Sequence, residues 1–522
     1  MVDNIDDIAK QVEERKKEEA ERLAKDESDP KNNGELSSKF VRECLYANEL
    51  GDGMLYAAIH KDQFVFNKST GEWLTWGGSF WERDIMNQAA SVVETVAERY
   101  LKEAYKLVNQ ITEAKQAKES KKAVGLKATQ DAIYTRVSRL RSNRGREQCL
   151  KMAHTNRENA LAIKGDELDT KSWFLACQNG VIDLRTGKLR KGRPDDYLSK
   201  ASPVEYIGVN YPAPLWESTL LEIFSGDHEL VDFIRRLFGY ALTGLHTEHI
   251  FPILWGKGWN GKGTIIETIS YVLGPLAGPI QSEMMLDQWR PKGSTGPSPD
   301  IMALKGLRMA FASESDEGRR LSPSRVKWLT GGDTLVGRNP YDKYEIKFTP
   351  THTLFLQTND KPIPPQDDFA FWERSILIPF ELSFVDRKPQ GKFERRADKD
   401  LREKLEKEGH GILSWLVRGC LEWQDQGLNI PPVVIGAGKD WRRDEDILQD
   451  FLDTCCSLDP AAEEQASKIY PVFKVWYEKN ISKKSISQKR FGRMMSKRFK
   501  REKKGTYVYY GVVLLCNEDL AF

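Results

Sequence analysis

The chain has 522 residues, of which 40% are hydrophobic and 30% are charged, and its formal net charge at pH 7 is +2. This composition excludes an intrinsically disordered chain, and the length allows roughly three or four domains of about 100–200 residues each. No apolar run approaches the roughly 20 residues that a membrane span requires, and the N-terminus lacks a signal-peptide core. We therefore expect an intracellular, cytoplasmic protein.

The seven cysteines and seven histidines are scattered along the chain. Only Cys455 and Cys456 are close in sequence, and adjacent cysteines lack the spacing of a zinc-binding pair. We therefore expect neither a zinc site nor a disulfide framework, and buried thiols instead.

Residues 1–36 form a charged leader. Opposite charges four residues apart, such as Glu13 with Lys17 and Glu18 with Arg22, would support a solvated helix. Its apolar residues are too few to form a stripe that faces a core. We expect a helical or disordered extension.

Residues 37–245 have the pattern of an α+β region. The aromatic and glycine-rich segment 64–81 predicts β-hairpins, and apolar residues at helical spacing predict a long helix over 92–111. The segment 179–189 predicts a strand, a Thr-Gly turn and a second strand. Between this segment and the predicted long helix lie five arginines that suit either phosphate contacts or a solvated helix face. They are Arg136, Arg139, Arg141, Arg144 and Arg146.

The most informative segment is 251–264, Phe-Pro-Ile-Leu-Trp-Gly-Lys-Gly-Trp-Asn-Gly-Lys-Gly-Thr. A short apolar strand precedes the glycine loop, and an amphipathic helix follows it, which is the context of a phosphate-binding loop. Backbone N–H groups would surround phosphate oxygens, and Lys262 would reach the β- and γ-phosphates. We assign the nucleotide contacts to Gly256, Gly258, Asn260, Gly261, Lys262, Gly263 and Thr264.

One position departs from the usual pattern of such loops. Gly263 stands where a magnesium-binding Ser or Thr is normal. Thr264 therefore supplies that hydroxyl as a metal ligand, or water replaces it.

ATP hydrolysis also needs a carboxylate that organises the metal and the attacking water. A buried strand predicted over 307–313 runs directly into Glu314 and Asp316. Ligands of open α/β sheets bind at the carboxyl ends of strands. We expect Glu314 to act as the metal-organising and catalytic acid with Asp316 in support, and the alternative is an ordinary acidic turn.

Two more polar residues adjoin predicted strands. Asn359 follows a strand over 351–358 and suits a sensor of the γ-phosphate, although Asn is also common at turns. Arg374 precedes an apolar strand and suits a finger that acts in a neighbouring subunit's site. The alternative for Arg374 is a structural salt bridge.

The segment 329–348 predicts a β-hairpin inserted between the second and third strands, with its turn at 340–343. Lys343 would lie at or near the tip of this hairpin. An exposed lysine there suits phosphate contact that ignores base sequence, and the alternative is a solvated turn.

The C-terminal region begins after a helical segment over about 395–425. Pro431, Pro432 and the glycines at 436 and 438 predict a linker. In 440–522, helices followed by a strand over 506–515 predict a winged-helix-like domain. Basic residues crowd 483–504, with apolar residues interleaved at helical spacing, so one face would pack while the other meets DNA or solvent. The DNA-contacting residues predicted there are Lys489, Arg490, Arg493 and Lys497.

The chain resembles superfamily 3 helicases, and more narrowly the C-terminal, helicase half of phage, plasmid and poxvirus primase–helicases. The resemblance covers roughly residues 60–515 and includes the upstream segments 179–184 and 237–244. Its motifs are, in order, Gly256-x4-Gly261-Lys262, Ser313-Glu314, Lys327-x-Leu-Thr-Gly-Gly-Asp333, Gln357-Thr-Asn359-x-x-Pro362 and Trp372-x-Arg374.

The resemblance implies an α/β fold with an AAA+ P-loop core, built on a central, mostly parallel sheet over 246–430. An α+β domain of the primase–helicase type (37–245) would precede it, and the winged-helix-like domain (440–522) would follow. It also implies a ring, usually hexameric, that hydrolyses ATP with Mg²⁺ between subunits and draws single-stranded DNA through a central pore. The matching residues are Lys262 for the phosphate-loop lysine, Glu314 for the acid, Asn359 for the sensor, Arg374 for the finger, and Lys327, Arg338 and Lys343 for the DNA contacts around the pore hairpin.

We therefore expect an ATP-dependent DNA helicase that replicates a phage, plasmid or other mobile element. Its partners would be single-stranded and forked DNA and further copies of the chain. Only the charged leader precedes the resemblance, so we expect a separate polypeptide or the host to prime. The alternatives are an ATP-dependent initiator or loader without processive unwinding, and a pseudo-ATPase scaffold, which the intact motif residues argue against.

Overall fold

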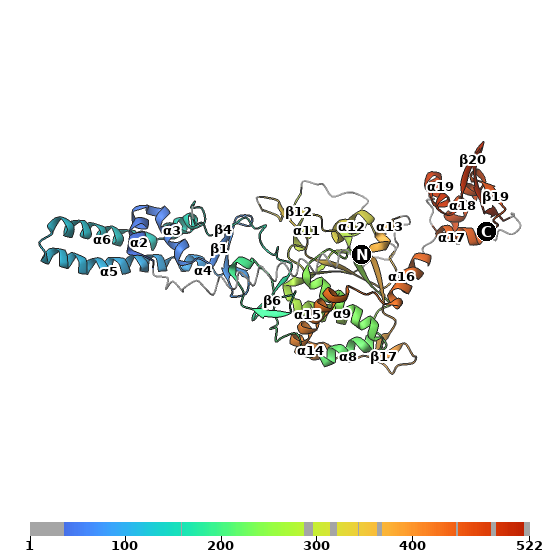
Figure 1. Cartoon of the computed structure of the whole chain (residues 1–522), viewed down its shortest axis with the longest axis horizontal. Coiled ribbons are helices and arrows are strands. Elements are labelled where there is room, and N and C mark those ends of the chain that lie inside the picture. The colour runs from blue at the N-terminus through green and yellow to red at the C-terminus, as the bar shows by residue number, and fades with distance from the viewer. Residues whose placement is uncertain are drawn as a thin grey trace. The chain divides into compact units, whose positions relative to one another are not determined.

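The computed structural model describes residues 36–157, 159–286, 296–313, 321–342, 344–362, 368–444, 447–481 and 487–515 (Figure 1). The side chains of residues 444, 490 and 497 are not described. The charged leader therefore lies outside the described residues, apart from residue 36. The chain divides into two compact units, 1–362 with 373–435 and 363–372 with 436–522.

The first unit begins with helices packed around one core. Val96, Tyr100 and Leu107 are fully buried on one face of α5, because apolar side chains recur there at helical spacing. This confirms the helix predicted over 92–111, although it begins at Glu94 and Val108 is 43% exposed. The helices are α2 (Ser38–Tyr46), α3 (Asn48–Ile59), α4 (Gln88–Ser91), α5 (Glu94–Gln116), α6 (Ser120–Leu140) and α7 (Asn143–Ala153).

The arginines of α6 and α7 bind acids within this part of the chain. Arg136 is buried and lies 3.4 Å from Asp52. Three others form pairs that join sequence-distant helices, namely Arg139 with Glu49, Arg141 with Glu94 and Arg146 with Glu94. The structure therefore favours an intramolecular role for these four arginines over phosphate contact.

Two four-stranded sheets complete the N-terminal part. The first has the order β3-β2-β1-β4 and confirms the hairpins predicted over 64–81. The second has the order β7-β6-β5-β8 and confirms the strand, turn and strand predicted over 179–189. The elements are β1 (Phe64–Asn67), β2 (Glu72–Trp76), β3 (Trp81–Arg83), β4 (Ala162–Ile163), β5 (Phe174–Cys177), β6 (Gly180–Asp183), β7 (Lys188–Arg190), η1 (Pro194–Asp196) and β8 (Ala201–Ser202).

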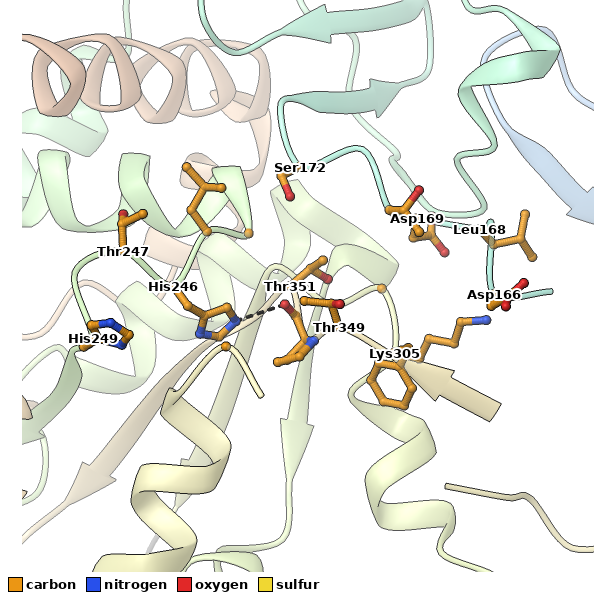
Figure 2. Close-up of a pocket in the computed structure, with 17 residues that line it drawn as sticks. Asp166, Leu168, Asp169, Ser172, His246, Thr247, His249, Lys305, Thr349 and Thr351 are labelled. Atoms are coloured by element: carbon orange, nitrogen blue, oxygen red, sulfur yellow. Dashed lines mark hydrogen bonds between the residues drawn. The ribbon is translucent and has the colours of Figure 1, made fainter. Parts of the chain in front are cut away.

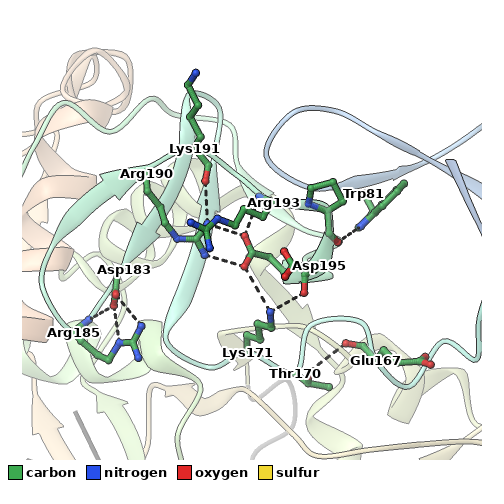
Figure 3. A network of polar contacts seen from close by, with 12 residues as sticks. Trp81, Glu167, Thr170, Lys171, Asp183, Arg185, Arg190, Lys191, Arg193 and Asp195 are labelled. Atoms are coloured by element: carbon green, nitrogen blue, oxygen red, sulfur yellow. Dashed lines mark hydrogen bonds and ion pairs between the residues drawn. The ribbon is translucent and has the colours of Figure 1, made fainter. Parts of the chain in front are cut away.

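Charged side chains hold the loops of the second sheet (Figure 3). The guanidinium group of Arg190 donates to both carboxylate oxygens of the buried Asp196, at 2.8 Å each. Lys171 lies 3.6 Å from the same carboxylate, and Arg185 donates to Asp183 at 2.8 Å. The bonds to Asp196 fix the segment that follows β7, and the bond between Arg185 and Asp183 lies in the turn between β6 and β7.

The remainder of the first unit is built on a five-stranded parallel sheet of order β10-β11-β14-β9-β15. Its inner strands are nearly continuous apolar runs, because helices cover both faces of such sheets. This confirms the strands predicted over 251–255, 307–313 and 351–358. The strands are β9 (Phe251–Trp255), β10 (Ala277–Ile280), β11 (Met309–Ser313), β14 (Thr353–Thr358) and β15 (Ser375–Pro379).

The remaining elements of this unit include the predicted helical segment over 395–425. The helices are α8 (Pro214–Ile223), α9 (His228–Thr243), α10 (Lys262–Leu273), η2 (Gly274–Leu276), η3 (Ser282–Met284), α11 (Pro299–Ala303), α12 (Pro323–Thr330), α14 (Leu401–Lys407) and α15 (Gly409–Gln426). The helix α13 (Phe369–Arg374) begins in the second unit and ends in the first. The antiparallel pair β12 (Leu335–Gly337) and β13 (Ile346–Phe348) confirms the predicted inserted hairpin. A parallel pair, β16 (Ser383–Val385) and β17 (Glu394–Arg396), follows β15.

The predicted linker contains the boundary between the two units, which falls between residues 435 and 436, but it is helical, because Pro432 begins α16 (Pro432–Asp444). Proline suits the first turn of a helix, because a backbone N–H group at that position would have no carbonyl partner within the helix. A Cβ atom on Gly436 or Gly438 would meet nothing within 4 Å, so these glycines do not mark a close contact either.

The second unit combines helices with short strands. Phe451, Phe473 and Phe491 lie in its core, which confirms that the apolar face of the basic segment packs inward. The single strand predicted over 506–515 is wrong, because Gly511 turns the chain with φ of +88°. The elements are α17 (Ile447–Cys455), β18 (Cys456–Ser457), β19 (Glu463–Gln465), α18 (Ala466–Asn480), α19 (Gln488–Arg498), β20 (Arg501–Lys504), β21 (Thr506–Tyr510) and β22 (Val513–Leu514).

The six cysteines within the described residues are buried free thiols, as their scattered spacing predicts. In the same part of the chain, no group of three or more His, Cys, Asp or Glu side chains could hold a metal ion. None of the described helices is both long enough and apolar enough to cross a membrane.

Two glycines bring α9 and α15 into backbone contact. A Cβ atom on Gly239 would overlap the backbone of Gly419 and Cys420, and one on Gly419 would overlap the carbonyl of Arg235. Both helices belong to the core beside the parallel sheet. Only glycine fits where two helix backbones meet this closely.

We predict that Gly419→Ala destabilises the first unit by about 1–3 kcal/mol or more, because neither backbone can move aside. The matched control is Gly436→Ala, because the added methyl group meets open space. It should leave the free energy of unfolding unchanged or raise it by about 0.5–1 kcal/mol. Thermal and urea unfolding, followed by tryptophan fluorescence, measure both effects. Equal unfolding midpoints for the two variants would contradict the close packing of α9 and α15.

Candidate nucleotide site

The glycine loop connects β9 to α10 and needs glycine at two positions. Gly256 and Gly261 have φ of +153° and +91°, a region that disfavours side chains. A Cβ atom on Gly261 would lie 2.7 Å from Ile223, and one on Gly256 would overlap the carbonyl oxygen of Phe380. Gly258 and Gly263 instead have open space around a would-be Cβ. The loop therefore curves tightly while leaving its middle accessible.

The loop borders a cavity of about 420 Å³. The chain runs from β9 through α10 to β10 on one side, and later through α13 to β15 on the other side of β9. The carboxyl end of β9 is therefore a topological switch point, where open α/β sheets bind ligands. The predicted residues that line the cavity are Gly258, Asn260, Gly261, Lys262, Gly263, Thr264 and Asn359.

Lys262 is the central charged group of this cavity and is 2% exposed. Its ammonium group donates to the carbonyl oxygen of Gly256 and lies 3.4 Å from Oδ1 of Asn359. Within the described residues, no carboxylate pairs with it. Burial alone lowers the pKa of Lys262 to about 8.

These residues fit a nucleotide phosphate. A buried cation without an acidic partner is costly, and a phosphate group would supply the missing negative charge. Backbone N–H groups at the start of α10 add favourable partial charge. The Thr264 side chain lines the same cavity, so its hydroxyl could serve a phosphate-bound Mg²⁺ in place of the absent Ser or Thr at position 263.

The strand register aligns the other predicted groups with this cavity. Thr358 pairs with Trp255, and Ser313 pairs with Gln357, so β9, β14 and β11 end at the same edge of the sheet. Asn359 follows β14 directly and contacts Lys262. Glu314 and Asp316 follow β11 in sequence but lie outside the described residues.

Arg374 lies at the other end of the sheet. It directly precedes β15, whose first residue, Ser375, pairs with Phe251 at the start of β9. Five residues of strand, about 16 Å, therefore separate it from the glycine loop of its own chain. Arg374 is not among the residues that line the cavity.

The predicted DNA contacts fall in two places. Arg338 follows β12, and its guanidinium group donates to the carbonyl oxygen of Asp342 at 3.2 Å, while Lys327 is half-buried in the last turn of α12. Lys343 lies outside the described residues. On α19, Lys489 and Arg493 are exposed, and the side chains of Arg490 and Lys497 are not described.

The sequence pattern does not predict the apolar wall of the cavity. Ile223 ends α8, Phe384 lies in β16 and Leu401 begins α14, and all three line the space beside the loop. The backbone N–H of Phe384 donates to the carbonyl oxygen of Trp259 at 2.6 Å, which joins the loop to β16. No local pattern marks these residues, because they come from segments far apart in sequence.

A second cavity, of about 520 Å³, lies beside residues that precede β9, β11 and β14 (Figure 2). His246 has Nε2 3.0 Å from the carbonyl oxygen of Pro350 and Nδ1 3.4 Å from that of Thr330. These two carbonyls flank the segment that carries the β12–β13 hairpin. Burial lowers the pKa of His246. The ammonium group of Lys305 donates to the carbonyl oxygen of Gly165 and lies beside Asp166 (Figure 2).

Three comparisons relate the chain to known proteins. Residues 53–225 match the family described as "D5 N terminal like". The chain is 28% identical over 335 residues to "Putative helicase L207/L206" of Acanthamoeba polyphaga mimivirus, which covers 62% of this chain and 35% of that protein. It is 24% identical over 426 residues to "Putative helicase 022R" of Frog virus 3, covering 67% of this chain and 44% of the relative.

The chain thus matches less than half the length of each of these relatives. Among solved structures, the match to the apo C-terminal region of NrS-1 covers 71% of this chain and 90% of that one. The identity is 10% and the TM-score is 0.39, which is too low to establish a shared fold. The chain therefore contains a D5 N-terminal-like region and is similar, over about two-thirds of its length, to viral proteins named as putative helicases.

Proposed function

We propose that the protein is an ATP hydrolase that drives DNA unwinding during replication of viral or mobile-element DNA. The observation that carries this proposal is the buried Lys262 ammonium, which has no carboxylate partner within the described residues and contacts Asn359 at the carboxyl edge of the sheet. The viral relatives named as helicases support the coupling of this site to DNA.

We assign a separate role in hydrolysis to each of the polar residues of the proposed site. Bound ATP and Mg²⁺ supply the phosphoryl group and the charge that neutralises its oxygens. Lys262 and the loop amides hold the phosphates, and Asn359 orients the γ-phosphate or the attacking water. The sequence assigns Mg²⁺ to Thr264 and Glu314 and the polarisation of water to Glu314.

The separation between Arg374 and the loop supports a site that is shared between subunits. An arginine about 16 Å from its own cavity cannot stabilise charge there. In a ring of identical subunits, each Arg374 would enter the next subunit's cavity and complete it. A homo-oligomer is therefore part of the proposal.

Two regions would contact DNA. The hairpin carries Arg338 and Lys343, and Tyr341 and Tyr344 beside Lys343 are fully and 65% exposed, which suits stacking on the bases of a single strand. From α17 onward the second unit has the order helix, two strands, two helices and three strands, namely α17, β18, β19, α18, α19, β20, β21 and β22. We propose that this winged-helix-like arrangement binds the duplex side of a fork through α19.

The first prediction concerns pH. Bound phosphate raises the pKa of Lys262 above its free value of about 8, because the ammonium gains an anionic partner. Affinity for a non-hydrolysable ATP analogue should therefore be constant below about pH 8 and fall by up to about tenfold per pH unit above it. Equilibrium titrations from pH 7 to about 9.5 measure this. A slope that persisted in Lys262→Arg, which stays charged, would assign the titration to another group.

The second prediction concerns hydrolysis. Lys262→Ala should abolish ATP turnover, because the transferring phosphoryl group loses the positive charge that stabilises it. Glu314→Gln should keep nucleotide affinity while turnover falls about 100-fold or more, since an amide cannot act as the carboxylate does. Steady-state phosphate release and nucleotide titration check both variants. Normal turnover in Glu314→Gln would move the acid assignment to Asp316.

The third prediction concerns the shared site. Arg374→Ala and Lys262→Ala should each be inactive alone. An equimolar mixture should recover up to about a quarter of wild-type turnover, the fraction of interfaces that combine an intact loop with an intact finger. Native mass spectrometry confirms that mixed oligomers form. Mixed oligomers without turnover would show that Arg374 acts within its own chain.

A further inference from the structure

The ribbon formed by β20 and β21 has two chemically different faces. Arg501 pairs with Tyr509 and Lys503 pairs with Tyr507, whereas Glu502 pairs with Val508. Successive side chains of a strand point to opposite faces. We use "arginine face" for Arg501, Lys503, Tyr507 and Tyr509, and "glutamate face" for Glu502 and Lys504 together with the adjoining Lys500 and Tyr510.

The cations of the glutamate face are neutralised within the protein. Lys500 lies 2.8 Å from Glu502, and Lys504 lies 2.7 Å from Glu463 on β19. The Tyr510 hydroxyl also donates to Glu502, at 2.9 Å. These partners lower the pKa of Glu502 and raise that of Lys504. The charges of this face are therefore already partly compensated.

The arginine face lacks such compensation. Of the described carboxylates, none pairs with Arg501 or Lys503. The Arg501 guanidinium lies over the Tyr507 ring, 4.3 Å from its centre, and Tyr507 is 48% exposed. An arginine stacked on an exposed tyrosine is held in place while its N–H groups stay available to an anion.

The arginine face turns toward α19. The Tyr509 hydroxyl donates to the carbonyl oxygen of Gly492 at 3.2 Å, and a Cβ atom on Gly492 would lie 3.9 Å from Nη1 of Arg501. Lys489 and Arg493 flank Gly492 on the helix and are exposed, and no described carboxylate pairs with either. Arg501 on the ribbon therefore lies beside the part of α19 that carries Lys489 and Arg493.

We propose that this surface, Lys489, Arg493, Arg501, Lys503 and Tyr507, binds the phosphate backbone of duplex DNA, and that Lys500 and Lys504 do not contact it. The 11 residues of α19 span about 16 Å and the 4 of β20 about 13 Å, so helix and ribbon together reach across the roughly 12 Å major groove. The inference rests on the proposed binding of duplex DNA by the second unit.

Paired charge removal in the full-length protein tests which face is used. Arg501→Gln with Lys503→Gln should weaken binding to a fluorescent duplex by about tenfold or more and reduce the salt slope of log Kd by about two. The matched control, Lys500→Gln with Lys504→Gln, removes the same charge from the other face and should leave both quantities within error. Fluorescence anisotropy over a range of salt concentrations measures them.

Gly492 offers a second test that removes no side chain. Gly492→Glu places a carboxylate beside Arg501, and Gly492→Gln provides the neutral control of equal size. The glutamate variant should bind the duplex several-fold more weakly than the glutamine variant. Circular dichroism and thermal unfolding of each variant establish that the unit remains folded.

The outcomes separate this inference from the proposed function. Equal losses of duplex affinity from the two ribbon pairs would overturn the inference. So would an unchanged affinity in Arg501→Gln with Lys503→Gln while Lys489→Gln with Arg493→Gln weakens binding. Either outcome would leave duplex binding by α19 intact. Unchanged binding in all three pairs would overturn both. Equal losses on a single strand and on a duplex would show that the surface does not distinguish the two, and would overturn its assignment to duplex DNA.

Discussion

One buried cation is the centre of the proposed site. Lys262 is held between the carbonyl oxygen of Gly256 and the side chain of Asn359, and no acid among the described residues neutralises it. Burying a charge without a partner costs stability, so a protein that keeps this arrangement presents a site for an anion. The positive φ of Gly256 and Gly261, the parallel sheet and the packing of α10 all position this ammonium group.

The direction of the parallel strands gives the site a second property. The glycine loop and Asn359 lie where strands end, whereas Arg374 lies where β15 begins. A parallel sheet holds such groups a strand length apart, and no side-chain rotation closes that distance. The proposed finger can therefore serve only another copy of the chain, which makes assembly a requirement of the proposed chemistry.

The local sequence pattern was sufficient to predict the elements whose residues are neighbours in sequence. The strand, glycine loop and helix over 251–273, the hairpin around 335–348 and the buried face of α19 follow from spacing alone. The pairing of Arg136 with Asp52, the wall formed by Ile223 and Phe384, and the second cavity join segments that only the fold brings together. The helix that begins at Pro432 and the turn at Gly511 were not predicted, because proline can also begin a helix and glycine can also interrupt a strand pattern.

Strand displacement on a forked duplex tests the central claim, that nucleotide bound at Lys262 drives unwinding. Wild-type protein with ATP and Mg²⁺ should release the labelled strand from substrates with 3′ or 5′ tails, preferring one tail polarity, and Lys262→Ala should release none while still binding the fork. ATP turnover without strand release on any substrate would contradict a helicase. It would indicate an initiator or loader that uses the same site for assembly.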